Sequence, residues 1–181
     1  MENRVVESVI SSLAAAPARV PPGLVGTAPF AVSGGAPPRS IADLGYFAVG
    51  FAPMDDIHRE FHDLLAGLEE AGDQGEKLLA LHDHLLRHCS QEERWMIDTR
   101  FAGGAAHARE HEILLEVIAE VRRRFDAGDS DIVLRLAQEL PQWFEQHANT
   151  LDAALAVHLR EFNERNGPNG LEDAATASAS A

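Results

Sequence analysis

Four stretches of this chain repeat apolar residues at intervals of three and four, the spacing that puts them on one face of an α-helix. They cover about residues 53–71, 76–99, 105–126 and 130–163. Glycines mark the connections, and Pro141 predicts a kink in the last stretch. Because short connections favour antiparallel neighbours and no strand pattern competes, the sequence predicts an all-α, up-down-up-down antiparallel four-helix bundle.

Polar side chains that can bind metal ions interrupt each of the four apolar faces. They are His58 in the first stretch, His88 and Glu92 in the second, His107 and His111 in the third, and His147 in the fourth. Residues four apart on a helix lie about 5–6 Å apart, so His88 pairs naturally with Glu92 and His107 with His111. The pairs His58/His62 and His84/His88 are alternatives, although His62, His82, His84 and His158 fit the flanks of their helices.

A single core histidine is usually satisfied by a hydrogen bond, but six inward polar groups would each need a buried partner. One shared metal site meets that need. Nitrogen and oxygen donors suit iron, manganese, zinc or copper, and carboxylates favour a pair of ions because they can bridge. The chain contains no HExxH, CxxC or Glu-x-x-His motif that would indicate a different kind of metal site.

Several short segments resemble those of bacterial hemerythrins. They are FAVGF (47–51), MDDIH (54–58), HCSQEE (88–93), HAREH (107–111) and WxxxH (143–147), followed by Asp152. The resemblance covers about residues 46–160 and implies two iron ions per chain, oxo- or hydroxo-bridged. It implies that Glu92 and Asp152 bridge the irons and that the terminal ligands are His58, His88, His107, His111 and His147.

Asp152 is a predicted ligand through the resemblance alone. On an ideal helix, a residue five positions after His147 lies about 140° around the axis. Either the last helix is distorted at this point or the carboxylate reaches sideways.

The resemblance also implies that apolar side chains keep water and protons away from bound O2. The predicted wall of this O2 pocket consists of Phe61, Cys89, Trp143, Phe144 and Ala148. Family members often carry Phe where this chain has Cys89, and Gln where it has Ile57. We interpret Cys89 as a small core residue in preference to a redox-active thiol.

By resemblance, the protein is expected to bind O2 reversibly at non-haem iron and not to act as an enzyme. Three histidines would hold one iron and two the other, which leaves one open coordination position. Two alternatives stay open: an O2 or redox sensor acting through the N-terminal extension, and turnover of peroxide or nitric oxide at the open iron. Metal storage or a structural zinc site is a further alternative.

Composition limits which partners are expected and indicates how the chain is divided. The formal net charge is -14, with 15 Lys+Arg against 29 Asp+Glu, so neither nucleic acid nor a membrane is an expected partner. One cysteine and the lack of a signal-like N-terminus predict a cytoplasmic protein. Residues 1–45, rich in Pro, Gly and Ala, are predicted to be an extension with one short helix that could bind a protein partner or a second copy. The predicted bundle covers 46–163 and a disordered tail 164–181.

Overall fold

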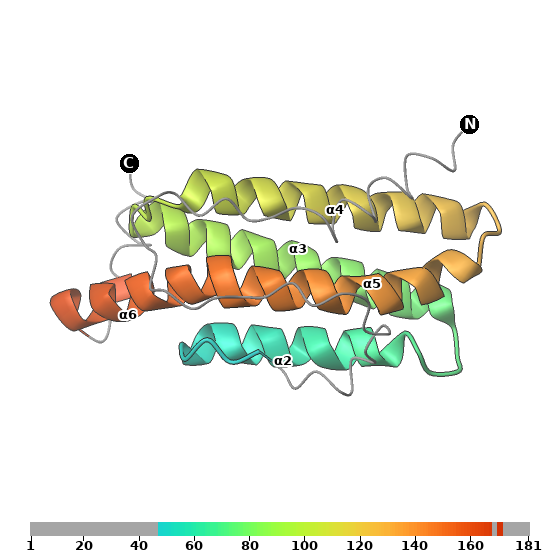
Figure 1. The fold of residues 1–181 in the computed structure, drawn as a ribbon, viewed down its shortest axis with the longest axis horizontal. Helices are drawn as coiled ribbons and strands as arrows, with labels where there is room; N and C mark the ends of the chain where they lie inside the picture. The colour runs from blue at the N-terminus through green and yellow to red at the C-terminus, as the bar shows by residue number, and fades with distance from the viewer. Residues whose placement is uncertain (1–46, 168–169, 172–181) are drawn as a thin grey trace, which may run out of the picture.

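The computed structural model describes residues 47–167 and 170–171, and they form a four-helix bundle (Figure 1). The first three helices are α2 (Ala52–Gly67), α3 (Gln74–Asp98) and α4 (Gly104–Asp126). The fourth is a continuous rod of α5 (Asp131–His147), the π-helical turn η2 (Ala148–Asp152) and α6 (Ala153–Asn166). Because α3 packs against α2 and α4, and α4 against α5, the predicted bundle is confirmed. The predicted extension, 1–45, lies outside the described residues.

Local signals in the sequence account for where the helices begin and end. Pro53 occupies the first turn of α2, where its missing N–H costs nothing. At the start of α3 the Asp73 carboxylate accepts from the backbone N–H groups of Gly75 and Glu76, at 2.9 and 3.1 Å. Such a cap satisfies donors that the first turn leaves free. Arg123 and Arg124 lie in the last turn of α4, next to the negative end of its dipole.

The fourth rod departs from regular α-helical geometry next to Asp152. α5 continues through the buried Pro141 as a helix, whereas the change of hydrogen bonding comes at Ala148–Asp152. A π-turn accommodates one extra residue per turn and so shifts every later side chain around the axis. The rod therefore presents different faces before and after η2.

The core has two parts. The larger cluster runs along the bundle from Leu78 and Ile132 to Phe144, and the smaller one surrounds Met54 and Leu159. Leu171 packs against the smaller cluster, and α6 continues to Asn166. Helical structure therefore extends past residue 164, where we expected the tail to begin, and Leu171 covers apolar surface there. Residues 168–169 and 172–181 lie outside the described part.

The segment 47–51 runs over the bundle before α2 begins. Its Phe47 ring lies 5.8 Å from the Phe144 ring, and Arg160 Nη1 donates to the carbonyl oxygens of Val49 and Gly50 at 3.0 and 3.1 Å. Gly50 has φ +77°, a conformation that glycine adopts without steric cost. This segment supplies backbone groups close to the centre of the bundle.

Of the helices in 47–167 and 170–171, none combines the length and the apolar character needed to cross a lipid bilayer.

Candidate metal centre

All seven predicted ligands point into the interior of the bundle. Each is at most 4% exposed. They come from different elements: His58 from α2, His88 and Glu92 from α3, His107 and His111 from α4, His147 from the end of α5, and Asp152 from η2. A bundle can bury so many polar groups only if they satisfy one another or share a bound ion.

The π-turn explains how Asp152 joins this set. In η2, hydrogen bonds span five residues, so positions five apart lie about one turn apart. Asp152 therefore faces the same way as His147, and its Oδ1 lies 3.1 Å from His147 Nε2. Of the two explanations for the spacing of Asp152, the structure supports a distorted helix.

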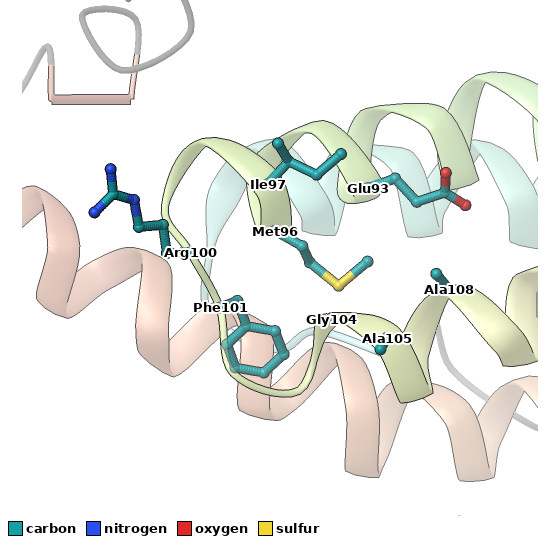
Figure 2. A pocket seen from close by; sticks show the side chains of 8 residues that line it. All are labelled: Glu93, Met96, Ile97, Arg100, Phe101, Gly104, Ala105 and Ala108. Atoms are coloured by element: carbon teal, nitrogen blue, oxygen red, sulfur yellow. The ribbon is translucent and has the colours of Figure 1, made fainter. Parts of the chain in front are cut away.

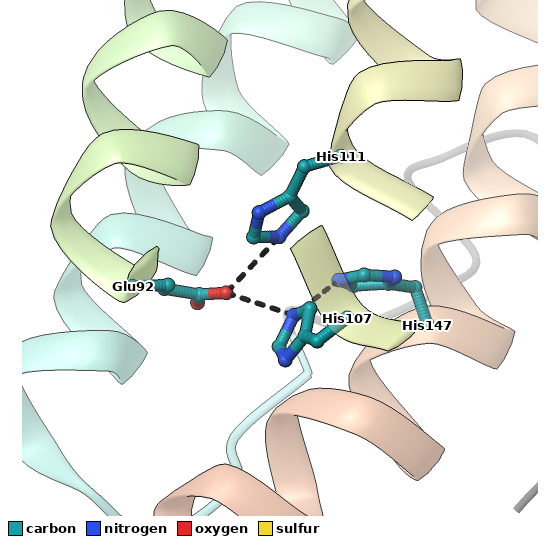
Figure 3. Close-up of side chains that lie close together, drawn as sticks. All are labelled: Glu92, His107, His111 and His147. Atoms are coloured by element: carbon teal, nitrogen blue, oxygen red, sulfur yellow. Dashed lines mark hydrogen bonds and ion pairs between the residues drawn. The ribbon is translucent and has the colours of Figure 1, made fainter. Parts of the chain in front are cut away.

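The ligand atoms form two groups that share one carboxylate. The first contains Glu92 with His107, His111 and His147, and Figure 3 shows their side chains pointing toward one another from α3, α4 and α5. The second contains His58, His88, Glu92 and Asp152. Within each group, one donor atom from every residue lies within 4.8 Å of the others.

Glu92 presents one oxygen to each group. Its Oε1 is 3.0 Å from His88 Nε2 and 4.0 Å from His58 Nε2. Its Oε2 is 3.2 Å from His107 Nε2 and 3.3 Å from His111 Nε2. The carboxylate thus lies between a pair of imidazoles on one side and two further imidazoles on the other.

Asp152 divides its oxygens in the same way. Its Oδ2 is 3.2 Å from His58 Nε2. Its Oδ1 is 3.0 Å from His107 Nε2 and 3.1 Å from His147 Nε2. Two carboxylates arranged in parallel between two sets of imidazoles can bridge a pair of cations.

The donor set fits metal ions on two further grounds. Around an ion with bonds of about 2.1 Å, neighbouring donor atoms lie about 3.0–3.4 Å apart. The closest donor pairs here are 3.0–3.3 Å apart, including His107 Nε2 and His147 Nε2 at 3.0 Å. In addition, several atoms that face the cluster are buried without a hydrogen-bond partner among the described residues: His58 Nε2, His111 Nε2, Glu92 Oε2 and both Asp152 oxygens. Cations would satisfy the inward-facing atoms of this set.

Comparison with known proteins agrees with this geometry. The family model described as hemerythrin HHE cation binding domain matches residues 49–156. This chain belongs to the hemerythrin family.

A bacteriohemerythrin of Ralstonia nicotianae is 33% identical over 129 residues, which cover 70% of this chain and 91% of that protein. Bacteriohemerythrins of Methylococcus capsulatus and Stenotrophomonas maltophilia are 30% and 32% identical, over 58% and 63% of this chain and 82% and 80% of their own lengths. No solved structure gives a significant match.

A backbone group outside the predicted ligand set orients one of its imidazoles. His58 Nδ1 donates to the carbonyl oxygen of Phe47 at 2.8 Å, which leaves Nε2 facing the cluster. His111 Nδ1 lies 3.5 Å from Glu93 Oε1. Such outer partners set the tautomer and the ring orientation of metal-binding histidines. The Nδ1 atoms of His88, His107, His111 and His147 are buried without a hydrogen-bond partner among the described residues.

Neighbouring imidazoles balance the charge of the buried carboxylates. Burial and the Asp152 charge raise the pKa of Glu92, but His88, His107 and His111 outweigh them and hold it well below its usual range. Burial lowers the pKa of His107, but Asp152 and Glu92 overcome this and raise it to about 9. A cation that binds here must therefore displace protons.

Aromatic rings cover part of the predicted ligand cluster. Phe144 lies edge-on to His58 with ring centroids 5.1 Å apart and touches Phe61 at 4.3 Å. Trp143 stacks on His147 at 4.6 Å. Cys89 and Ala148, the other predicted wall residues, are buried next to His88 and His147 in the chain. Burial raises the pKa of the Cys89 thiol, so the thiolate form is disfavoured.

His84 corrects a prediction made from the sequence. It was assigned to a helix flank, but its side chain is only 2% exposed. The ring lies 6.1 Å from Phe61 and 5.8 Å from His88. Helical periodicity cannot separate the edge of an apolar face from its flank, and here packing by α2 closes over the residue. Burial, followed by the His88 charge, lowers the pKa of His84 to about 4.

A pocket of about 360 Å³ lies where α3 turns into α4 (Figure 2). Met96, Phe101 and Ala108 contribute apolar walls, and Ile97 stands at the surface with 71% exposure. Glu93 also lines the pocket and contacts the outer nitrogen of His111. Sequence patterns did not indicate this pocket, because it arises from how the turn packs.

Proposed function

We propose that the buried cluster binds two iron ions and that the protein binds O2 reversibly. One observation supports this most directly: Glu92 and Asp152 each direct one oxygen to either side of the cluster. Bacteriohemerythrin is also the name of the similar proteins found by comparison. The geometry and these similarities together support the iron pair, the ligand roles and O2 binding.

The two sides of the cluster differ in their number of imidazoles. His107, His111 and His147 would hold one ion, and His58 and His88 the other. Both ions would share Glu92 and Asp152. The second ion therefore has one protein ligand fewer, which leaves a coordination position open for a small diatomic molecule.

When bound, the reduced iron pair supplies the electrons and the coordination position that O2 requires. The protein residues fix the donors on four helices and exclude water. Phe144 covers His58, while Trp143 covers His147. Because the rest of the predicted wall is also apolar or, at Cys89, a protonated thiol, it offers no evident group for acid–base turnover. This favours O2 binding over peroxide or nitric oxide consumption.

Metal content is the first test. Protein purified without added metal should contain two iron ions per chain. Glu92→Gln should lose both ions because both groups include this residue, whereas the matched change His82→Gln on the same helix should retain them. A single zinc ion per chain in the unmodified protein would contradict the proposal.

O2 binding is tested separately on the iron-loaded protein. After anaerobic reduction, exposure to air should produce a visible absorption that disappears when O2 is removed, over repeated cycles. An irreversible change would count against O2 carriage. Steady-state consumption of peroxide faster than by the same amount of free iron would instead support the enzymatic alternative.

A further inference from the structure

His84 is a buried imidazole that the proposed ligand set does not use. Its Nε2 is buried and has no hydrogen-bond partner among the described residues. Its Nδ1 lies 3.4 Å from Glu60 Oε2. A neutral imidazole carries one donor and one acceptor nitrogen, so a proton on Nδ1 facing Glu60 leaves Nε2 as an unsatisfied acceptor.

His88, one turn along α3, has the complementary deficiency. Its Nε2 faces Glu92 at 3.0 Å, inside the cluster. Its Nδ1 is turned away from that contact and is buried without a hydrogen-bond partner in the described part of the chain. With Nε2 used for an ion, Nδ1 must carry the proton, and histidines that bind metal almost always donate this proton to an acceptor.

We propose that His84 is the outer hydrogen-bond partner of His88, through one ordered water that accepts from His88 Nδ1 and donates to His84 Nε2. The two rings are neighbours in a T-shaped arrangement, with their centroids 5.8 Å apart. A water that accepts one hydrogen bond and donates another can connect two buried nitrogens that do not bond to each other directly. This single molecule would satisfy both buried nitrogens, and buried waters are found where polar atoms lack other partners.

Glu60 completes the connection to the surface. Its Oε2 contacts His84 Nδ1, and its Oε1 accepts from Arg87 at 3.2 Å. The Glu60 carboxylate favours the His84 tautomer with the proton on Nδ1, which directs the lone pair of Nε2 toward the interior. His84 is thus a positioning residue: it orients His88 without touching the ion. This inference rests on the proposed metal-binding function.

Titration of the metal-free protein with Co²⁺, whose visible absorption reports its ligands, tests the inference. His84→Leu should weaken one of two bound Co²⁺ equivalents by about 10–100-fold, the usual effect of removing an outer partner. His84→Gln has nearly the same size but keeps a hydrogen-bonding amide, so it should recover most of the affinity. His82→Leu, on the same helix, should bind Co²⁺ like the unmodified protein.

The outcomes separate this inference from the proposed function. If the unmodified protein binds fewer than two Co²⁺, the proposed function fails and the inference fails with it. If it binds two and His84→Leu does so equally tightly, or His84→Gln is as weak as His84→Leu, only the inference fails.

A measurement on the unmodified protein does not depend on whether the variants fold. In the Zn²⁺-loaded protein, ¹⁵N NMR of the histidine rings should place the His84 proton on Nδ1 and show a His88 Nδ1–H protected from exchange. A His84 proton on Nε2 would overturn the proposal.

Discussion

Phe144 gives the sharpest test of how packing and site chemistry are coupled. Its ring is 3% exposed and lies 5.1 Å from His58, 4.3 Å from Phe61 and 6.3 Å from His88. Phe144→Ala would remove a ring in contact with both imidazoles of the His58/His88 side. The cavity left behind would have polar ring nitrogens nearby, so water could enter beside the proposed second ion.

The expected loss of stability follows from burial. Replacing a fully buried Phe by Ala costs about 3–5 kcal/mol. Ile132 is a matched control because it is 0% exposed in the same cluster, and Ile→Ala costs about 2–5 kcal/mol. It precedes Phe144 by twelve residues, or about 18 Å along α5 at 1.5 Å per residue. The two variants should therefore be similarly destabilised but differ at the site.

Urea unfolding of the metal-free variants gives the stability change, and iron loss in air gives the effect on the site. Phe144→Ala should lose iron at least about tenfold faster than the unmodified protein, equivalent to about 1.4 kcal/mol in the barrier. Ile132→Ala should lose it at close to the original rate. Equal acceleration in both variants would show that overall stability, and not local shielding, controls the site.

Three further predictions concern other parts of the molecule. Because the pKa of His107 is raised from 6.5 to about 9, the metal-free protein should lose up to about 3 kcal/mol of stability as pH rises from 6.5 through 9. Urea unfolding across pH 6–10 should show a smaller loss in His107→Gln. The same dependence of unfolding free energy on pH in both proteins would contradict this prediction. Cys89, 2% exposed, should react with a thiol reagent only after unfolding, and prompt reaction in the native protein would refute its burial. Asp73→Ala should cost about 1 kcal/mol in urea unfolding through loss of the α3 cap, without changing metal content.

Much of the fold was readable from the sequence because it depends on local periodicity. The apolar spacing and the glycine turns identified four helices, and the pairs His88/Glu92 and His107/His111 follow from one turn of a helix. The inward direction of these side chains followed from their place on apolar faces. Such features depend on residues close together in the chain.

Other features could be decided only by the three-dimensional structure. The π-turn is a local change of hydrogen bonding that apolar periodicity does not reveal, and it brings Asp152 to the face of His147. The burial of His84 depends on Phe61 and Glu60 from another helix. Spacing can identify candidate donors on each helix, but their oxygens and nitrogens converge on two points only because four helices pack at particular rotations about their axes.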